Sequence, residues 1–213
     1  MTTGKLIALE GGEGAGKSTQ ARLLAEALAA RGVAVVTTRE PGGTPGAEAI
    51  RELLLSTRGE GWNPRAEALL FAAARSDHVE RLIAPALAAG KWVICDRYLD
   101  SSRAYQGAGS GVADADLLDL HRIGSGGLVP DLALLIEVSP EEAERRLARR
   151  DKGQADRIGG RDADYHERVA RAFARFAEQE PGRFARIDGN GETGQTHARI
   201  LQRLAPLLEA TPA

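Results

Sequence analysis

The stretch LIALEGGEGAGKSTQARLLAEAL, residues 6–28, decides the fold of this chain. An apolar run predicts a β-strand over residues 5–10, and apolar residues at helical spacing predict a helix over 18–31. Between them lies the pattern GxxxxGKS (11–18), which binds phosphate when it joins a strand to a helix. The stretch therefore predicts a nucleoside triphosphate site at the end of the first strand.

The composition of this loop explains the chemistry we expect from it. Glycines let backbone N–H groups turn toward phosphate oxygens, and the start of a helix adds partial positive charge. Lys17 is expected to contact the outer phosphates and Ser18 to ligate Mg²⁺. The expected ATP-binding residues are Gly11, Gly12, Glu13, Gly14, Ala15, Gly16, Lys17, Ser18 and Thr19.

Apolar runs and helical periodicity alternate along the rest of the chain. The four further strands that we predict cover residues 33–38, 92–96, 132–138 and 184–187. The further helices cover residues 46–57, 64–89, 114–125, 163–180 and 195–209, and one more starts at Ser139-Pro140-Glu141-Glu142. Nearly unbroken apolar strands separated by helices predict an α/β fold, with a five-stranded parallel sheet covered on both faces, in one domain over 1–213.

Composition narrows the class of protein. A formal net charge of −2 gives no reason to expect nucleic-acid binding, so an anionic ligand must be held by local positive charge. Cys95 is the sole cysteine, which excludes disulfides and cysteine-based zinc sites within the chain. The first apolar run (6–9) is too short for a signal peptide, and no run reaches the roughly 18–20 residues of a membrane span. We therefore expect a cytoplasmic protein.

A second stretch, VICDRYLDSSRAYQG (93–107), ends a predicted strand with charge and continues into two serines and a Tyr-Gln-Gly turn. Parallel sheets place ligands at the carboxyl ends of their strands, so Asp96 is expected to hold Mg²⁺ or its waters. Arg97 is expected to bind a second phosphate through paired N–H groups. The sequence lacks Asn-Lys-x-Asp, the signature expected of a guanine-specific switch. A kinase that phosphorylates a small acceptor therefore fits the sequence better than a switch or a motor protein.

Four motifs in order carry a resemblance to a known family: the phosphate loop, TREPGGTPG (38–46), LLFAAARSDH (69–78) and DRYLDSSRAYQG (96–107). Together they resemble bacterial thymidylate kinases over nearly the whole chain. The resemblance implies transfer of the γ-phosphoryl group of ATP to dTMP, giving dTDP for DNA precursor synthesis. It also implies the five-stranded parallel sheet, Mg²⁺ and a homodimer.

The same resemblance implies roles for residues near the acceptor base. Phe71 stacks on thymine and Arg75 donates to a base carbonyl; the two lie four residues apart and so share a helix face. Ser102 hydrogen-bonds the base, Tyr105 lies near the deoxyribose, and Gln106 lies beside the base. The other implied residues are Arg39, Glu40, Pro41 and Arg51 around the acceptor phosphate, Glu13 near the sugar, and Ser101, which has a weaker match.

The segment ARRDKGQADRIGGRD, residues 148–162, is basic, glycine-containing and poor in apolar residues, which predicts an exposed mobile lid. The resemblance implies that Arg157 in this lid approaches the transferring phosphate and acts with Lys17, Asp96 and Arg97. Family members commonly have an acidic residue where this chain has Gly159-Gly160, so the hinge of the lid and the arginine that reaches the phosphates stay open.

Two alternatives to a thymidylate kinase stay open at the level of sequence. A nucleoside monophosphate kinase of another base specificity would be stimulated by a different acceptor. A non-catalytic, ATP-dependent switch would hydrolyse ATP slowly, and no monophosphate would accelerate it.

Overall fold

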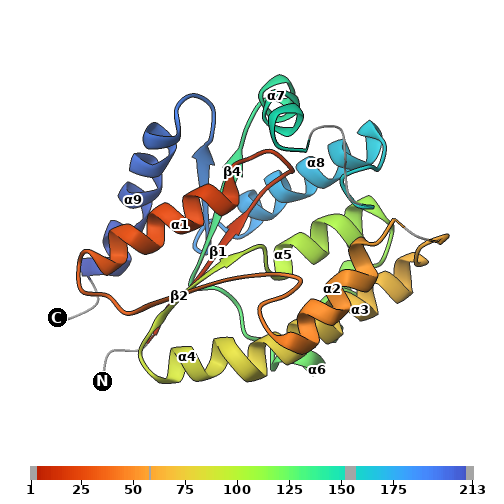
Figure 1. The fold of residues 1–213 in the computed structure, drawn as a ribbon, viewed down its shortest axis with the longest axis horizontal. Helices are drawn as coiled ribbons and strands as arrows, with labels where there is room; N and C mark the ends of the chain where they lie inside the picture. The colour runs from red at the N-terminus through yellow and green to blue at the C-terminus, as the bar shows by residue number, and fades with distance from the viewer. Residues whose placement is uncertain (1–3, 58, 152–156, 210–213) are drawn as a thin grey trace.

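Five parallel strands form the sheet at the centre of the structure, a computed structural model that describes residues 4–57, 59–151 and 157–209 (Figure 1). The strands are β1 (Leu6–Glu10), β2 (Val35–Arg39), β3 (Trp92–Asp96), β4 (Leu132–Glu137) and β5 (Phe184–Asp188). Their order is β2-β3-β1-β4-β5, and every neighbouring pair is parallel. The predicted sheet is confirmed.

Helical segments connect the strands and cover the sheet (Figure 1). The α-helices are α1 (Lys17–Ala29), α2 (Pro45–Leu55), α3 (Pro64–His78), α4 (Ala84–Ala88), α5 (Leu99–Ser102), α6 (Asp114–Ser125), α7 (Pro140–Asp151), α8 (Ala163–Gln179) and α9 (Thr193–Glu209). Two π-helical segments are η1 (Val79–Ile83) and η2 (Arg103–Gly109). Within the described residues, no helix is long and apolar enough to cross a membrane.

Both faces of the sheet are buried because successive side chains of each strand point to opposite sides. On one face, Ile7 and Leu9 pack in a cluster with Leu24 of α1 and Ile200 of α9. On the other face, β4 packs against α8, while β1 and β3 pack against η1 and α4. The carboxyl ends of β1 and β3 are neighbours, since Leu9 pairs with Asp96, and this register brings the two polar motifs together.

The helix predicted over 64–89 is three segments in the structure. α3 ends at His78, the π-helical turn η1 follows, and α4 begins at Ala84. Pro85 explains the irregularity: it lacks an N–H group and cannot donate to the carbonyl of Arg81 as a regular α-helix requires.

The turn predicted after β3 is wrong: residues 99–109 are helical, as α5 followed by η2. Asp100 stabilises this path, because its fully buried carboxylate forms ion pairs with Arg103 and Arg183 at 3.1 and 2.6 Å. The partner Arg183 is distant in sequence, which is why local pattern did not reveal the helix.

The exposed lid predicted over 148–162 is also partly wrong. α7 continues to Asp151, so the lid begins as helix, and Ile158 is buried at 8 % exposure against the core. Residues 152–156 of the predicted lid, Lys152 among them, lie outside the described residues.

Candidate active site

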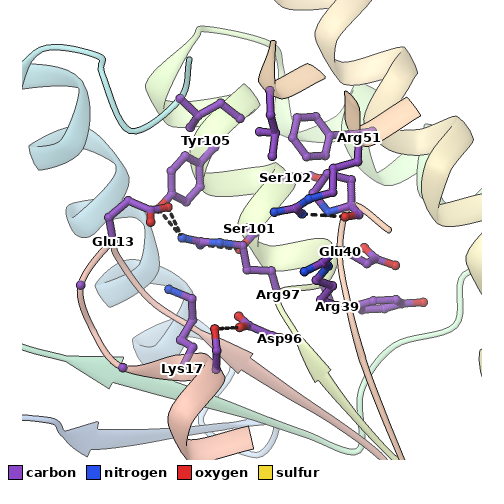
Figure 2. Close-up of a pocket in the computed structure, with 18 of the residues that line it drawn as sticks. Glu13, Lys17, Arg39, Glu40, Arg51, Asp96, Arg97, Ser101, Ser102 and Tyr105 are labelled. Atoms are coloured by element: carbon purple, nitrogen blue, oxygen red, sulfur yellow. Dashed lines mark hydrogen bonds and ion pairs between the residues drawn. The ribbon is translucent and has the colours of Figure 1, made fainter. Parts of the chain in front are cut away.

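A cavity of about 580 Å³ opens at the carboxyl ends of β1, β2 and β3, and its polar lining is shown in Figure 2. The phosphate loop, the loop after β2, α3 and the segment α5–η2 all contribute to it. The lining residues that the sequence predicted are Glu13, Gly14, Gly16, Lys17, Ser18, Thr19, Arg39, Glu40, Pro41, Arg51, Phe71, Arg75, Asp96, Arg97, Ser101, Ser102, Tyr105 and Gln106. The predicted phosphate end and the predicted acceptor end therefore share one cavity.

The phosphate loop has the backbone that the glycine pattern requires. Gly11 has φ 131°, and a Cβ atom there would overlap the carbonyl oxygen of Ile136, so only glycine fits. Gly16, with φ 91°, precedes the first turn of α1. Gly11, Gly12 and Ala15 belong to the loop but are not among the residues that line the cavity.

Lys17 folds back over this loop. Its Nζ donates to the carbonyl oxygens of Gly11 and Gly12 at 3.1 and 2.7 Å. Burial, and then the positive charge of Arg97, lower the pKa of Lys17 to about 8 against the opposing effect of Glu13 and Asp96. The buried ammonium group of Lys17 therefore favours the binding of an anion that balances its charge.

Ser18 and Asp96 both line the cavity and form an oxygen-rich pair there; Figure 2 labels Asp96. The hydroxyl of Ser18 donates to Asp96 Oδ2 at 2.5 Å, which brings the two predicted metal ligands together. Hydroxyl and carboxylate oxygens suit a hard cation such as Mg²⁺, and such a cation usually keeps waters and phosphates as its other ligands. The donor set therefore fits Mg²⁺.

Arg97 has φ 68°, the left-handed region that non-glycine residues rarely adopt and that is typical of functional sites. Its guanidinium donates to Gly11 O, Glu13 Oε1 and Tyr105 Oη at 2.9, 2.5 and 3.0 Å. It also lies over the Tyr105 ring, 4.8 Å from the centroid. Burial opposes its charge, but Tyr105, Glu13 and further acidic neighbours keep the pKa of Arg97 above its ordinary value.

Glu10 supports the strained turn at Arg97 through hydrogen bonds with residues that follow it. The sequence analysis missed this role. Its fully buried carboxylate accepts from Tyr98 N at 2.9 Å and from Ser101 Oγ at 2.6 Å. Burial, and then the charge of Asp100, raises the pKa of Glu10 to about 7. The only local signal was a carboxylate that ends an otherwise apolar strand.

Arg75 organises the other end of the cavity. Its Nε donates to Glu40 Oε2 at 2.6 Å, and its Nη2 donates to Ser102 Oγ and Tyr98 O at 2.8 and 3.2 Å. Glu40 Oε1 lies 3.1 Å from Nδ1 of the buried His78. These bonds fix the guanidinium in the lining of the cavity, to which Phe71 also belongs.

Two further arginines enter the cavity between these ends (Figure 2). Arg51 Nη1 donates to the carbonyl of Pro41 at 2.7 Å, and Arg39 forms an exposed ion pair with Glu48 at 3.2 Å. With Arg97, they give the middle of the cavity a concentration of guanidinium groups that suits phosphate.

Arg157 is the predicted site residue that the structure brings elsewhere. It donates to the carbonyl oxygens of Ser56 and Gly59 at 2.6 and 3.2 Å, in a separate hollow beside Trp62. Among the described residues of this region, Arg146 of α7 is the arginine that lines the main cavity, and the sequence analysis missed it.

Arg146 spans the phosphate loop and the loop after β5. It donates to Ala15 O at 3.3 Å and to Gly189 O at 2.8 Å, and Glu142 holds its Nε at 2.6 Å. The sequence shows adjacent arginines at 145 and 146, but only the helical phase of α7 decides which one faces the cavity. Other unpredicted lining residues are Leu55, Tyr98, Leu147 and Ile158.

Comparisons with known proteins agree with this geometry. The sequence model of the thymidylate kinase family matches residues 9–200. A thymidylate kinase of Rhizorhabdus wittichii is 54% identical over 205 residues, 96% of this chain and 99% of that relative. One of Caulobacter vibrioides is 46% identical over 200 residues, 94% and 95% of the two chains. The crystal structure of thymidylate kinase from Ehrlichia chaffeensis aligns with a TM-score of 0.78 at 32% identity, covering 95% of this chain and 99% of that one.

Proposed function

Because the chain belongs to the thymidylate kinase family, we propose that its cavity holds ATP and dTMP with their phosphates facing each other. As a member of this family, the protein transfers a phosphoryl group from ATP to dTMP and so forms dTDP. The observation that carries the proposal is the single cavity that joins the phosphate loop to the wall formed by Phe71 and Arg75. Family membership removes the alternatives of a switch and of another base specificity.

ATP occupies the phosphate-loop end in this proposal. Backbone N–H groups from the loop and the start of α1 meet its phosphates, and Lys17 exchanges the carbonyls of Gly11 and Gly12 for phosphate oxygens. Arg146 lies at the same end and supplies a cation for the donor nucleotide.

The acceptor dTMP occupies the other end. Its base stacks on Phe71, receives hydrogen bonds from Arg75 and Ser102, and lies beside Gln106. Tyr105 lies under the sugar and leaves little room for a 2′-hydroxyl. Arg39, Arg51 and Arg97 hold the phosphate, with Glu40 and Pro41 supporting them.

The reaction is an in-line displacement. A phosphate oxygen of dTMP forms a bond to the γ-phosphorus of ATP, the bond from this phosphorus to the β–γ bridging oxygen breaks, and ADP leaves with that electron pair. The acceptor phosphate is already an anion near neutral pH, so no strong base is needed. Lys17 and Arg97 stabilise the charge that moves between the two phosphates.

Ser18 and Asp96 would hold Mg²⁺ in this arrangement, since their oxygens lie together in the lining of the cavity. A Mg²⁺ ion held by these two oxygens would supply positive charge that offsets the negative charge of the ATP phosphates. The pair is positioned for this role by β3 and by the first turn of α1.

We further propose a homodimer in the cytoplasm, where ATP and dTMP are available, with no nucleic-acid or membrane partner. The family resemblance supports the dimer, and exposed apolar side chains on α3 and α6 support it physically.

The test measures ADP release from Mg²⁺ and ATP with dTMP, dUMP, UMP, CMP, AMP, GMP or no acceptor. We expect strong stimulation by dTMP and weaker stimulation by dUMP, because one methyl group discriminates by roughly 1–3 kcal/mol. Arg97→Ala is expected to lower turnover on the order of 10³-fold. Arg22→Ala, on the exposed face of α1, is the matched control. Unchanged turnover in Arg97→Ala would exclude the role proposed for Arg97.

A further inference from the structure

Glu67 of α3 is a buried carboxylate that does not line the cavity, yet it contacts a residue that does. Its side chain is 3 % exposed. Its Oε1 accepts from Nε2 of Gln106 at 2.9 Å, and its Oε2 accepts from Nη2 of Arg161 at 2.5 Å. Gln106 lines the cavity at the acceptor end. Glu67 is therefore placed to act on the acceptor through Gln106.

The contact fixes which way the Gln106 amide points. An ionised carboxylate only accepts hydrogen bonds, so the NH₂ group of Gln106 must turn toward Glu67. The carbonyl oxygen of the same amide then points away from Glu67. In the reversed orientation, the amide oxygen would face the carboxylate oxygen, and two acceptors would meet in a buried place.

Arg161 supplies the cation that pairs with Glu67 Oε2, so the buried carboxylate is not left without a partner. Arg161 itself is held firmly: its Nη1 donates to Ser110 Oγ at 2.7 Å, and its guanidinium lies 4.6 Å from the centroid of the Tyr165 ring.

We propose that Glu67 is a positioning residue that makes the Gln106 carbonyl an acceptor for the ring N–H of the acceptor base, and so selects thymine over cytosine. The inference rests on the proposed placement of Gln106 beside the base. Thymine carries a hydrogen on its ring nitrogen N3, whereas cytosine carries a lone pair there. A fixed carbonyl therefore bonds to thymine and faces an unsatisfied acceptor on cytosine, which a buried site tolerates poorly.

The experiment compares kcat/KM for dTMP and for dCMP, two acceptors with the same sugar and phosphate. In Glu67→Gln, the neighbour of Gln106 can donate as well as accept, so Gln106 is free to reverse. We expect the ratio of kcat/KM for dTMP to that for dCMP to fall on the order of tenfold, mainly through a higher KM for dTMP. The KM for ATP is expected to stay unchanged.

A double-substitution cycle separates this inference from the proposed function. Gln106→Leu removes the amide and is expected to lower the same ratio. Adding Glu67→Gln to Gln106→Leu is expected to lower it no further, because the carboxylate acts through the amide. If Gln106→Leu leaves the ratio unchanged, the placement of Gln106 is wrong. If Gln106→Leu lowers it and Glu67→Gln does not, the inference is wrong.

Two further variants guard against a loss of folding. Arg161→Gln removes the cation and is expected to lower the ratio in the same direction, whereas Arg161→Lys, which keeps the charge, is expected to retain most of it. Ile200→Val lies in the core on the opposite face of the sheet and serves as the stability control, because it is expected to lower the stability of the protein moderately. We expect it to keep the wild-type ratio of kcat/KM for dTMP to that for dCMP. A lower ratio in Ile200→Val would mean that stability alone sets the selectivity, and the inference would fail.

Discussion

Lys17 and Glu10 are both buried ionisable side chains beside the phosphate loop, and burial moves their pKa values in opposite directions. The pKa of Lys17 falls to about 8, and the pKa of Glu10 rises to about 7. Each shift disfavours the charged form, as desolvation requires. Both groups therefore titrate within the range of ordinary assay buffers, which makes their roles measurable by pH.

For Lys17, we expect the affinity for ATP to fall as pH rises above about 8, because the free protein then loses the ammonium that contacts the phosphates. Below that pH the lysine is charged and the affinity should depend little on its titration. Calorimetric titration with ATP between pH 7.0 and 9.5, at constant ionic strength, measures this. A dissociation constant that stays flat across this range would show that Lys17 keeps its proton or does not contact ATP.

For Glu10, the folded pKa of about 7 lies above the ordinary value of 4.5. Between these values the folded chain binds more protons than the unfolded chain, so the free energy of unfolding falls as pH rises. The full effect is about 3 kcal/mol and is complete above pH 7. Glu10→Gln removes the titration. We therefore expect urea unfolding to show its stability, relative to the wild type, improving from pH 5 to pH 8.

The exposed Glu26 provides the control for this experiment, since its carboxylate lies on the surface of α1 in an ion pair with Arg22. Glu26→Gln should follow the wild-type pH profile. Parallel profiles for Glu10→Gln and the wild type would mean that Glu10 titrates at an ordinary pKa in the folded protein.

The residues that sequence predicted at the site are those whose chemistry is written in local motifs. Lys17 and Asp96 follow apolar strands, and Phe71 and Arg75 share a helix face, so each carries its own signal. Glu10 shows only a carboxylate at the end of an apolar strand, and this does not reveal its role because its partners Tyr98 and Ser101 follow a different strand. Positioning residues act through distant partners, and local pattern does not contain that information.

At the scale of elements, prediction succeeded where one physical signal dominates. The strand over 92–96 and the helix over 114–125 have the predicted ends, since apolar runs and helical spacing stop there clearly. Prediction failed for η2, where polar side chains such as Arg103 and Gln106 are buried by ion pairs and hydrogen bonds rather than by apolar contacts. The spacing of apolar residues reveals only segments that are buried by apolar contacts, so it misses segments that are buried by polar ones.

α3 carries Glu67, Phe71 and Arg75, so its stability supports the acceptor end of the cavity. Its first turn is capped by Asn63, whose side chain accepts from Ala66 N at 3.0 Å, and Pro64 follows the cap. We expect Asn63→Ala to lower the free energy of unfolding by about 1 kcal/mol. The KM for dTMP should not change, because the cap lies two turns before Phe71. Urea unfolding and steady-state kinetics measure the two quantities.

The adjacent exposed residue Arg65 provides a comparison for the cap. Arg65→Ala is expected to stay within about 0.5 kcal/mol of the wild type, since it makes no cap and alanine favours helix. Equal stability of Asn63→Ala and Arg65→Ala would contradict the capping role.

At the scale of the whole molecule, the decisive contacts join residues far apart in sequence. Arg161 and Glu67 are 94 positions apart, and Arg183 and Asp100 are 83 positions apart. The sequence predicted the sheet that makes such contacts possible, but the choice of partners follows from the packed structure. The lid illustrates this: its basic composition predicts an exposed loop, whereas Arg161 forms an ion pair with the buried Glu67.

The dimer that we propose also belongs to this scale. Four exposed apolar side chains lie on α3, on α6 and on the residues that follow α6: Leu69, Leu118, Ile123 and Val129. α3 and α6 pack against each other, and their labels lie on the same side of the molecule in Figure 1. Exposed apolar surface is typical of an interface between two copies of a chain. In a twofold-symmetric dimer, each subunit contributes the same residues, so one substitution changes the interface at two positions.

Ile123 is the most exposed of these side chains, at 72 %. We expect Ile123→Glu to convert the dimer to a monomer, because two carboxylates would then be buried in one apolar interface without a cation. Light scattering after gel filtration should show the mass fall from twice 22.6 kDa to 22.6 kDa. Leu53→Glu, an exposed position on α2, should leave the mass unchanged. A dimer that survives Ile123→Glu but is lost in Leu53→Glu would place the interface on α2, next to the Arg157 hollow, and the acceptor end of each cavity would then face its partner.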